Sequence, residues 1–153
     1  MQLRKCCNHP FLLNGVESDV RSKQPNSSTV DLLVNASGKF VLLDKLIPRL
    51  KADGHRILLF SQFKIMLDII EDYLHLRDFK CERIDGSITG LKRQAAIDRF
   101  QSKKGAEHGR DPPLIMLLST RAGGVGINLT AADTCVRQLH GLSKLLNVHL
   151  YLT

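Results

Sequence analysis

The stretch "RILLFSQFKIMLDIIEDYLHLR", Arg56 to Arg77, decides the fold class of this chain. Its first six residues form an apolar run of the length of a buried strand. The residues that follow place one apolar stripe at helical spacing, made of Phe63, Met66, Leu67, Ile70, Tyr73 and Leu74. The pattern therefore predicts a buried strand that leads directly into an amphipathic helix.

The same alternation continues on both sides of this stretch. A shorter strand is predicted at Lys80 to Ile84, a helix at Thr89 to Gln101 and a third apolar strand at Leu114 to Ser119. Upstream, Ser37 can cap a helix that ends near Gly54, although Pro48 should kink or shorten it. Apolar strands that alternate with helices are typical of an α/β fold, in which a parallel sheet has helices on both faces.

Composition limits the function classes. With 153 residues, of which 43% are hydrophobic, we expect one main domain. The net charge of +7 favours contact with a polyanion. No run of about 18 apolar residues could span a bilayer, so we expect a soluble, intracellular protein without a membrane partner. Its four cysteines should stay reduced, and "CCNH" at Cys6 to His9 has no second Cys/His pair, so no metal site is predicted.

The loop "STRAGGVGIN" follows the third predicted strand. Ligands of open parallel sheets bind beyond the carboxyl ends of the strands, and glycines let a backbone approach a phosphate. The loop matches neither the phosphate-binding pattern GxxxxGK[ST] nor the dinucleotide pattern G-x-G-x-x-G. From the residues alone, a ligand loop and a tight structural turn both remain open.

Five stretches carry a family resemblance in the order in which they occur: "LRKCCNHPFLL", "SGKFVLLDKLIPRL", "ILLFSQFKIMLDIIEDYL", "RIDGSITGLKRQAAIDRF" and "LLSTRAGGVGINLTAADT". Together they resemble the start of the second RecA-like lobe of Snf2-type chromatin-remodelling ATPases, in the chromodomain-helicase branch and its kismet-like subgroup. The resemblance divides the chain into a leading segment at 1–13, a flexible connector at 14–36, a truncated C-terminal helicase lobe at 37–135 and a divergent tail at 136–153.

The resemblance also implies residue roles. Contacts with DNA are implied for Ser61, Gln62, Gly86, Ser87, Thr120, Arg121 and Gly123, and contacts with the nucleotide for Gly126 and Asn128. From the residues alone, Ser61 and Gln62 can equally cap the next helix, and "DGS" at Asp85 to Ser87 can be an ordinary turn.

The family's activity is implied in the same way. In the complete enzyme, ATP with Mg²⁺ binds between two lobes, and the partners are the missing first ATPase lobe, duplex DNA and nucleosomes in the nucleus. The family's phosphate-binding loop, metal-holding acidic motif and terminal arginine motif are absent here, so we expect no catalytic residue and an inactive isolated chain. A gene-model error and a real truncation both remain open for the tail. The alternatives are a repair or RNA helicase lobe, or a non-catalytic truncated product that binds DNA or a partner.

Overall fold

The computed structural model describes residues 2–102, 111–120, 127–137 and 147–150. Before the sheet come α1 (Gln2–Asn8), the short 3-10 helix η1 (Pro10–Leu12), α2 (Val16–Lys23), α3 (Thr29–Asn35) and α4 (Gly38–Ala52). The sheet region contains β1 (Ile57–Ser61), α5 (Lys64–Leu76), β2 (Cys81–Ile84), α6 (Gly90–Gln101), β3 (Ile115–Ser119), β4 (Thr134–Arg137) and β5 (Asn147–Leu150). None of these helices is both long and apolar enough to cross a membrane.

The strands form one sheet in the order β2-β3-β1-β4-β5. The first four strands along the chain are parallel, and β5 pairs antiparallel with β4. The predicted parallel sheet is therefore confirmed, and β5 adds an antiparallel strand from the segment expected to be a divergent tail. Because parallel strands point the same way, the carboxyl ends of β1, β2 and β3 meet at one edge, called here the carboxyl edge.

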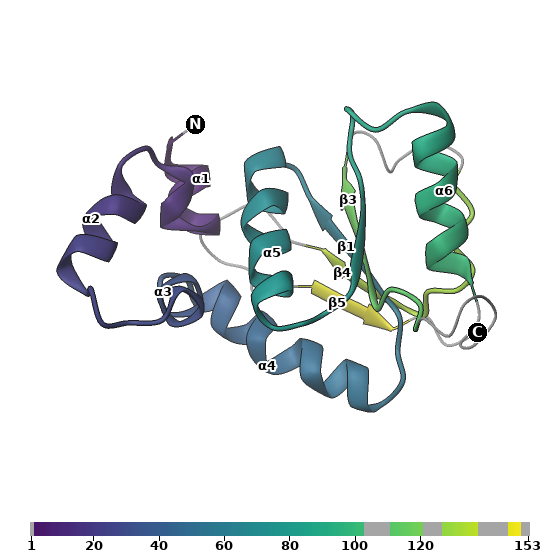
Figure 1. Ribbon diagram of the computed structural model, residues 1–153, viewed down its shortest axis with the longest axis horizontal. Coiled ribbons are helices and arrows are strands. Elements are labelled where there is room, and N and C mark those ends of the chain that lie inside the picture. Colours follow the sequence, from purple (N-terminus) through teal and green to yellow (C-terminus); the bar gives the residue numbers. More distant parts are fainter. Residues whose placement is uncertain (1, 103–110, 121–126, 138–146, 151–153) are drawn as a thin grey trace.

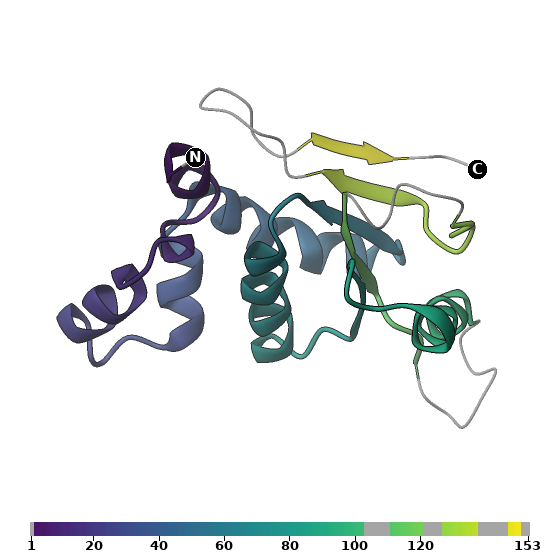
Figure 2. The same cartoon turned by 90° about the horizontal axis from the view of Figure 1, so that it is seen from above.

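Helices cover both faces of the sheet, as predicted. Figure 1 shows α5 and α6 on either side of the strands, and Figure 2 shows the same layers from above. Ile57 and Leu59 of β1 pack in the core with α4 and α5, whereas Met116 and Leu118 of β3 pack with Ala96 and Phe100 of α6. Side chains that alternate between the two faces of the sheet thus build two cores.

Helix α4 has the predicted bounds, but Pro48 does not shorten it and the Ser37 side chain does not cap it. It continues through the exposed Pro48 to Ala52, because Phe40, Leu43, Ile47 and Leu50 bury one face and compensate for the backbone bond that proline cannot make. Ser37 occupies the N-cap position, but its hydroxyl donates to the carbonyl of Asn8 at 3.0 Å. The helix start is therefore tied to α1.

The segment 14–36 contains two helices that its composition did not predict. Ser28 begins α3 by accepting a hydrogen bond from the N–H of Asp31 at 3.1 Å, and Leu32, Leu33 and Val34 are buried. Those three apolar residues give α3 a packing surface, whereas α2 buries no residue. The flexibility of the segment in solution stays a prediction.

His9 is a fully buried histidine that joins the leading segment to α3. Its Nδ1 accepts from the N–H of Phe11 at 3.2 Å, and its Nε2 lies 2.9 Å from the carbonyl of Leu33. These contacts fit the neutral ring that carries its proton on Nε2. Burial lowers the pKa of His9, although the hydrogen bond to Leu33 opposes this effect.

We expect the folded chain to lose stability on mild acidification through His9. A lowered folded pKa means that the stabilisation is complete above the ordinary value of 6.5 and is lost as the pH falls through it. Urea unfolding of the wild type should show a drop in the free energy of unfolding between about pH 7.5 and 5.5. His9→Gln should flatten that drop, and the control Gln24→Ala, at an exposed position, should not. Parallel profiles for wild type and His9→Gln would contradict the assignment.

Candidate nucleic-acid interface

Three loops meet at the carboxyl edge of the sheet. In the strand register, Ser61 is paired with Ser119 and Ile84 with Leu118. The residues that follow these strands are therefore neighbours, and the N–H of Thr120 donates to the carbonyl of Ser61 at 3.0 Å. The structure thus brings together the predicted DNA-contact residues Gln62, Gly86, Ser87 and Thr120 with Ser61 beneath them.

Ser61 and Gln62 are adjacent but differ in accessibility. Ser61 is buried, and its hydroxyl lies 3.4 Å from the carbonyl of Phe63, which it can donate to. Gln62 is exposed. Of these two residues, Gln62 is the one whose side chain can reach a ligand without a rearrangement.

The turn after β2 is held by a buried carboxylate. Asp85 accepts a hydrogen bond from the N–H of Ser87 at 2.8 Å and a second, very short one from the Ser87 hydroxyl. Gly86 is exposed, and an added Cβ there would meet no atom within 4 Å. The turn therefore presents Gly86 and Ser87 outward on a fixed support, with open space in front of Gly86.

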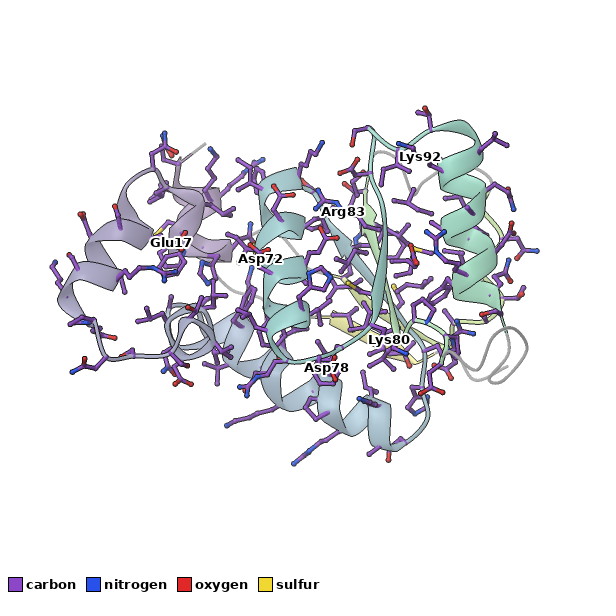
Figure 3. The ribbon with its side chains drawn as sticks, viewed as in Figure 1. Glu17, Asp72, Asp78, Lys80, Arg83 and Lys92 are labelled. Atoms are coloured by element: carbon purple, nitrogen blue, oxygen red, sulfur yellow. The ribbon has the colours of Figure 1, made fainter. Side chains whose placement is uncertain are left out.

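Arg83 supports this turn from within the fold (Figure 3). Its Nη1 lies 2.7 Å from a carboxylate oxygen of Asp68 and 2.7 Å from one of Glu71, both on α5. Its Nε and Nη2 donate to Asp85 at 3.0 and 2.8 Å. One guanidinium thus joins β2, α5 and the turn.

These contacts fix the charge states of the pair. Burial alone would raise the pKa of Asp85, but the hydrogen bonds from Ser87 and Arg83 outweigh it and lower the pKa to about 2. Burial alone would lower the pKa of Arg83, but the bonds to Glu71, Asp68 and Asp85 raise it instead. The pair is therefore ionised at neutral pH.

Lys64, the first residue of α5, adds a cation at the same turn. Its Nζ lies 3.1 Å from the Ser87 hydroxyl and 3.7 Å from Asp85, and its side chain is 59% exposed. Lys64, Arg83 and Asp85 are not among the residues that the sequence predicted to contact a ligand. The sequence could have indicated the role of Asp85. An aspartate that accepts a hydrogen bond from the N–H two residues later is typical of an Asx turn.

The other predicted residues have a different outcome. Arg121, Gly123 and Gly126 lie outside the described residues. Asn128 is exposed, and its carbonyl accepts from the Gln101 side chain at 2.9 Å, at the far end of α6 from the turn. The described contacts therefore do not bring Asn128 to the cluster of Gln62, Ser87 and Thr120.

Comparisons with known proteins agree with this architecture. The family model "Helicase conserved C-terminal domain" matches residues 38–139. The chain is 52% identical over 143 residues to chromodomain-helicase-DNA-binding protein 7 of Homo sapiens, and 51% identical over 143 residues to chromodomain-helicase-DNA-binding protein 8 of Homo sapiens. Each alignment covers 89% of this chain and 5% of the relative, so the chain spans about one twentieth of the length of these relatives.

Solved structures show the same fold. The Sulfolobus solfataricus SWI2/SNF2 ATPase C-terminal domain matches with a TM-score of 0.65 and 27% identity, over 88% of this chain and 50% of that one. The SWI2/SNF2 ATPase core from the same organism, solved in complex with dsDNA, matches with a TM-score of 0.64 and 25% identity, over 88% of this chain and 24% of that one. The predicted RecA-like lobe of Snf2 type is therefore confirmed as the fold.

We expect Asp85→Asn to destabilise the chain by about 2 kcal/mol at pH 7, because the amide leaves the largely enclosed Arg83 guanidinium with one counter-charge fewer. A folded pKa of about 2, below the ordinary 3.8, means that the stabilisation is present above pH 3.8 and is lost as the pH falls towards 2. Urea unfolding of both proteins should therefore converge near pH 2. Asp72→Asn, at an exposed position on α5, is the matched control. A gap between Asp85→Asn and wild type that is unchanged at low pH would exclude this role of the carboxylate.

Proposed function

Because this chain belongs to the family of helicase conserved C-terminal domains, we propose that it forms part of the second lobe of an ATP-dependent, DNA-translocating chromatin remodeller. Its own contribution is a set of contacts with the DNA backbone. The single observation that carries the proposal is the carboxyl edge, where Gln62, Gly86, Ser87 and Thr120 lie together beside Lys64.

The chemistry of this edge suits phosphate groups. The Gln62 amide and the Thr120 hydroxyl can donate hydrogen bonds to phosphate oxygens. Lys64 adds a positive charge on an exposed side chain. At Gly86 no side chain stands between the backbone and an approaching phosphate. Ser61 acts from beneath by positioning the loop. Contacts of this kind carry no base sequence information, so binding is sequence-indifferent.

The relatives support a chromatin remodeller in preference to a repair or RNA helicase. Both human relatives are chromodomain-helicase-DNA-binding proteins, and a solved neighbour is an ATPase core in complex with dsDNA. In the complete protein, cycles of lobe closure would move the two lobes along DNA and reposition nucleosomes in the nucleus. Arg121 and Gly123 remain proposed DNA contacts on the loop after Thr120.

The nucleotide is proposed to bind between this lobe and the first ATPase lobe, with Gly126 and Asn128 towards it. The described residues at the carboxyl edge do not fit a Mg²⁺ site, because the Arg83 guanidinium already occupies the position between the carboxylates of Asp68, Glu71 and Asp85. The sequence contains no GxxxxGK[ST] loop to hold the phosphates. We therefore assign no catalytic residue and no metal ligand for hydrolysis to this chain.

The chain should bind duplex DNA weakly, with strong salt dependence and no preference among sequences. Fluorescence anisotropy at several salt concentrations measures this. Gln62→Ala should weaken binding several-fold at every salt concentration, because it removes a neutral donor worth about 1 kcal/mol. Lys64→Gln should weaken binding and also lower the slope of log K against log salt by about 1.

The matched controls for DNA binding lie on the far side of the chain. Gln24→Ala and Lys23→Gln replace the same residue types at exposed positions at the end of α2. Neither should change the affinity or the slope. Equal effects of the Lys64 and Lys23 substitutions, or strong preference for one duplex sequence, would contradict the proposed surface.

The isolated chain should not hydrolyse ATP above background, because hydrolysis requires a metal, phosphate-binding groups and a positioned water acting together. Phosphate release with Mg²⁺-ATP and duplex DNA measures this. Asn128→Ala is the control for contamination. DNA-stimulated turnover that disappears in Asn128→Ala would show a catalytic site that this assignment lacks.

A further inference from the structure

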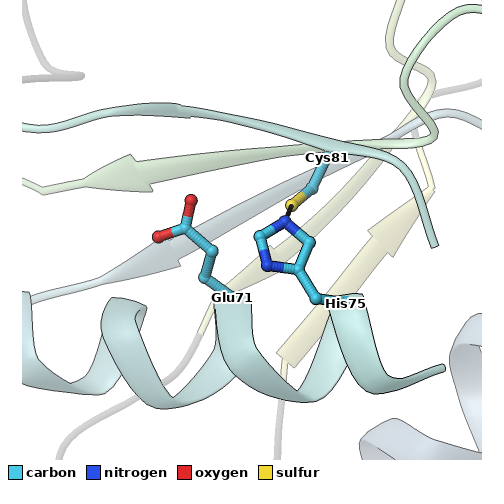
Figure 4. A group of neighbouring side chains, drawn as sticks. All are labelled: Glu71, His75 and Cys81. Atoms are coloured by element: carbon cyan, nitrogen blue, oxygen red, sulfur yellow. Dashed lines mark hydrogen bonds between the residues drawn. The ribbon is translucent and has the colours of Figure 1, made fainter. Parts of the chain in front are cut away.

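A second cluster of reactive side chains joins the end of α5 to β2. Glu71 and His75 lie four residues apart on α5, and Cys81 is the first residue of β2. Figure 4 shows the Glu71 and His75 side chains extending from one side of α5 towards β2, with the His75 ring beside Cys81. One potential ligand atom from each residue lies within 4.8 Å of the other two. No predicted DNA or nucleotide contact includes any of the three.

The fold holds these residues in place before any ligand arrives. Spacing of four residues puts Glu71 and His75 on the same face of a helix. The connection between α5 and β2 is short and closed by a hydrogen bond from the N–H of Phe79 to the carbonyl of Leu74 at 2.9 Å. Cys81 is fixed by its pairing with Ile115 in the sheet and packs against the core that contains α5.

The separations are close to those of a metal centre. Zn²⁺ bonds to a thiolate at about 2.3 Å and to imidazole at about 2.0 Å, which places the two ligand atoms of a tetrahedral centre about 3.6 Å apart. The Cys81 sulfur and the His75 Nε2 are 4.0 Å apart. His75 is exposed and Glu71 is half-buried, so both side chains have room for the remaining adjustment.

We propose that Glu71, His75 and Cys81 bind one Zn²⁺ ion, with water as the fourth ligand. Thiolate, imidazole and carboxylate together are a donor set that zinc accepts, whereas Mg²⁺ and Ca²⁺ prefer oxygen ligands alone. The ion would fasten the last turn of α5 to β2. Within the described residues, β2 is an edge strand that pairs only with β3, so this fastening acts where the sheet is least supported.

Glu71 can serve the metal without giving up its ion pair. Its Oε2 lies 2.7 Å from Arg83 Nη1, which leaves Oε1 for the metal. A hydrogen bond to the second oxygen of a ligating carboxylate is the usual way in which a protein orients that ligand. Through Arg83, the same carboxylate is linked to Asp85 and the turn of Gly86 and Ser87.

Binding should release a proton from the cysteine. A cysteine bonds zinc as its thiolate, so the metal–sulfur bond forms with loss of the thiol proton to solvent. Calorimetry in two buffers of different ionisation enthalpy should detect this proton release.

Titration of the full chain with Co²⁺, under a non-chelating reductant and without a polyhistidine tag, tests the site directly. One equivalent should produce a thiolate-to-cobalt charge-transfer band and the visible bands of a tetrahedral ion, and Zn²⁺ should displace both. A hundredfold excess of Zn²⁺ over its dissociation constant should raise the melting temperature by about 5 to 10 °C. His75→Gln and Cys81→Ser should each abolish the tight binding of the first equivalent of metal.

The chain also offers a control for the other thiols. The double variant Cys6→Ser/Cys7→Ser removes the thiols of α1 and should keep the full cobalt spectrum. His75→Gln changes an exposed side chain, so circular dichroism should show that the variant is folded. Its loss of metal binding can then be assigned to the missing ligand. The proposal is overturned if wild type gives no cobalt–thiolate band, if folded His75→Gln keeps the wild-type spectrum, or if the spectrum depends on Cys6 and Cys7.

Discussion

The carboxyl edge depends on the ion pairs that the Arg83 guanidinium makes with Asp68, Glu71 and Asp85. The Arg83 side chain is only 12% exposed, and three carboxylates from α5 and the turn surround it. A buried cation is tolerated when such partners compensate for its lost hydration, and removing a partner leaves charge uncompensated. Arg83 therefore sets the position of the turn relative to α5, and with it the position of Gly86 and Ser87.

The two clusters share Glu71, and this couples them physically. The carboxylate forms an ion pair with Arg83, and one of its oxygens lies within 4.8 Å of ligand atoms of His75 and Cys81. If the proposed ion binds, its positive charge competes with Arg83 for the Glu71 carboxylate and weakens that ion pair. Asp68 and Asp85 would still balance the guanidinium, so the turn should persist while the electrostatic field around it changes.

Sequence patterns predicted the strands and helices that depend on local periodicity. The strands β1 and β3 lie between helices and are continuous apolar runs, and α5 buries one apolar stripe. Both patterns can be recognised in the sequence alone. Helix α3 was missed because its three buried residues follow a long polar stretch. Arg83 was missed because its partners at Asp68 and Glu71 are distant in sequence, and only the packing of β2 beside α5 brings them together.

The same reason explains the mixed outcome at the candidate site. Parallel pairing of β1, β2 and β3 places Gln62, Ser87 and Thr120 at one edge, and this follows from the predicted topology alone. Which side chain is accessible does not follow from topology, since Ser61 turns inward while its neighbour is exposed. For the proposed translocating lobe, such a surface has a physical advantage. Among the described residues of this edge, neutral donors and the solvent-screened Lys64 bind phosphate weakly enough to be released, whereas Arg83 and its carboxylates pair with one another.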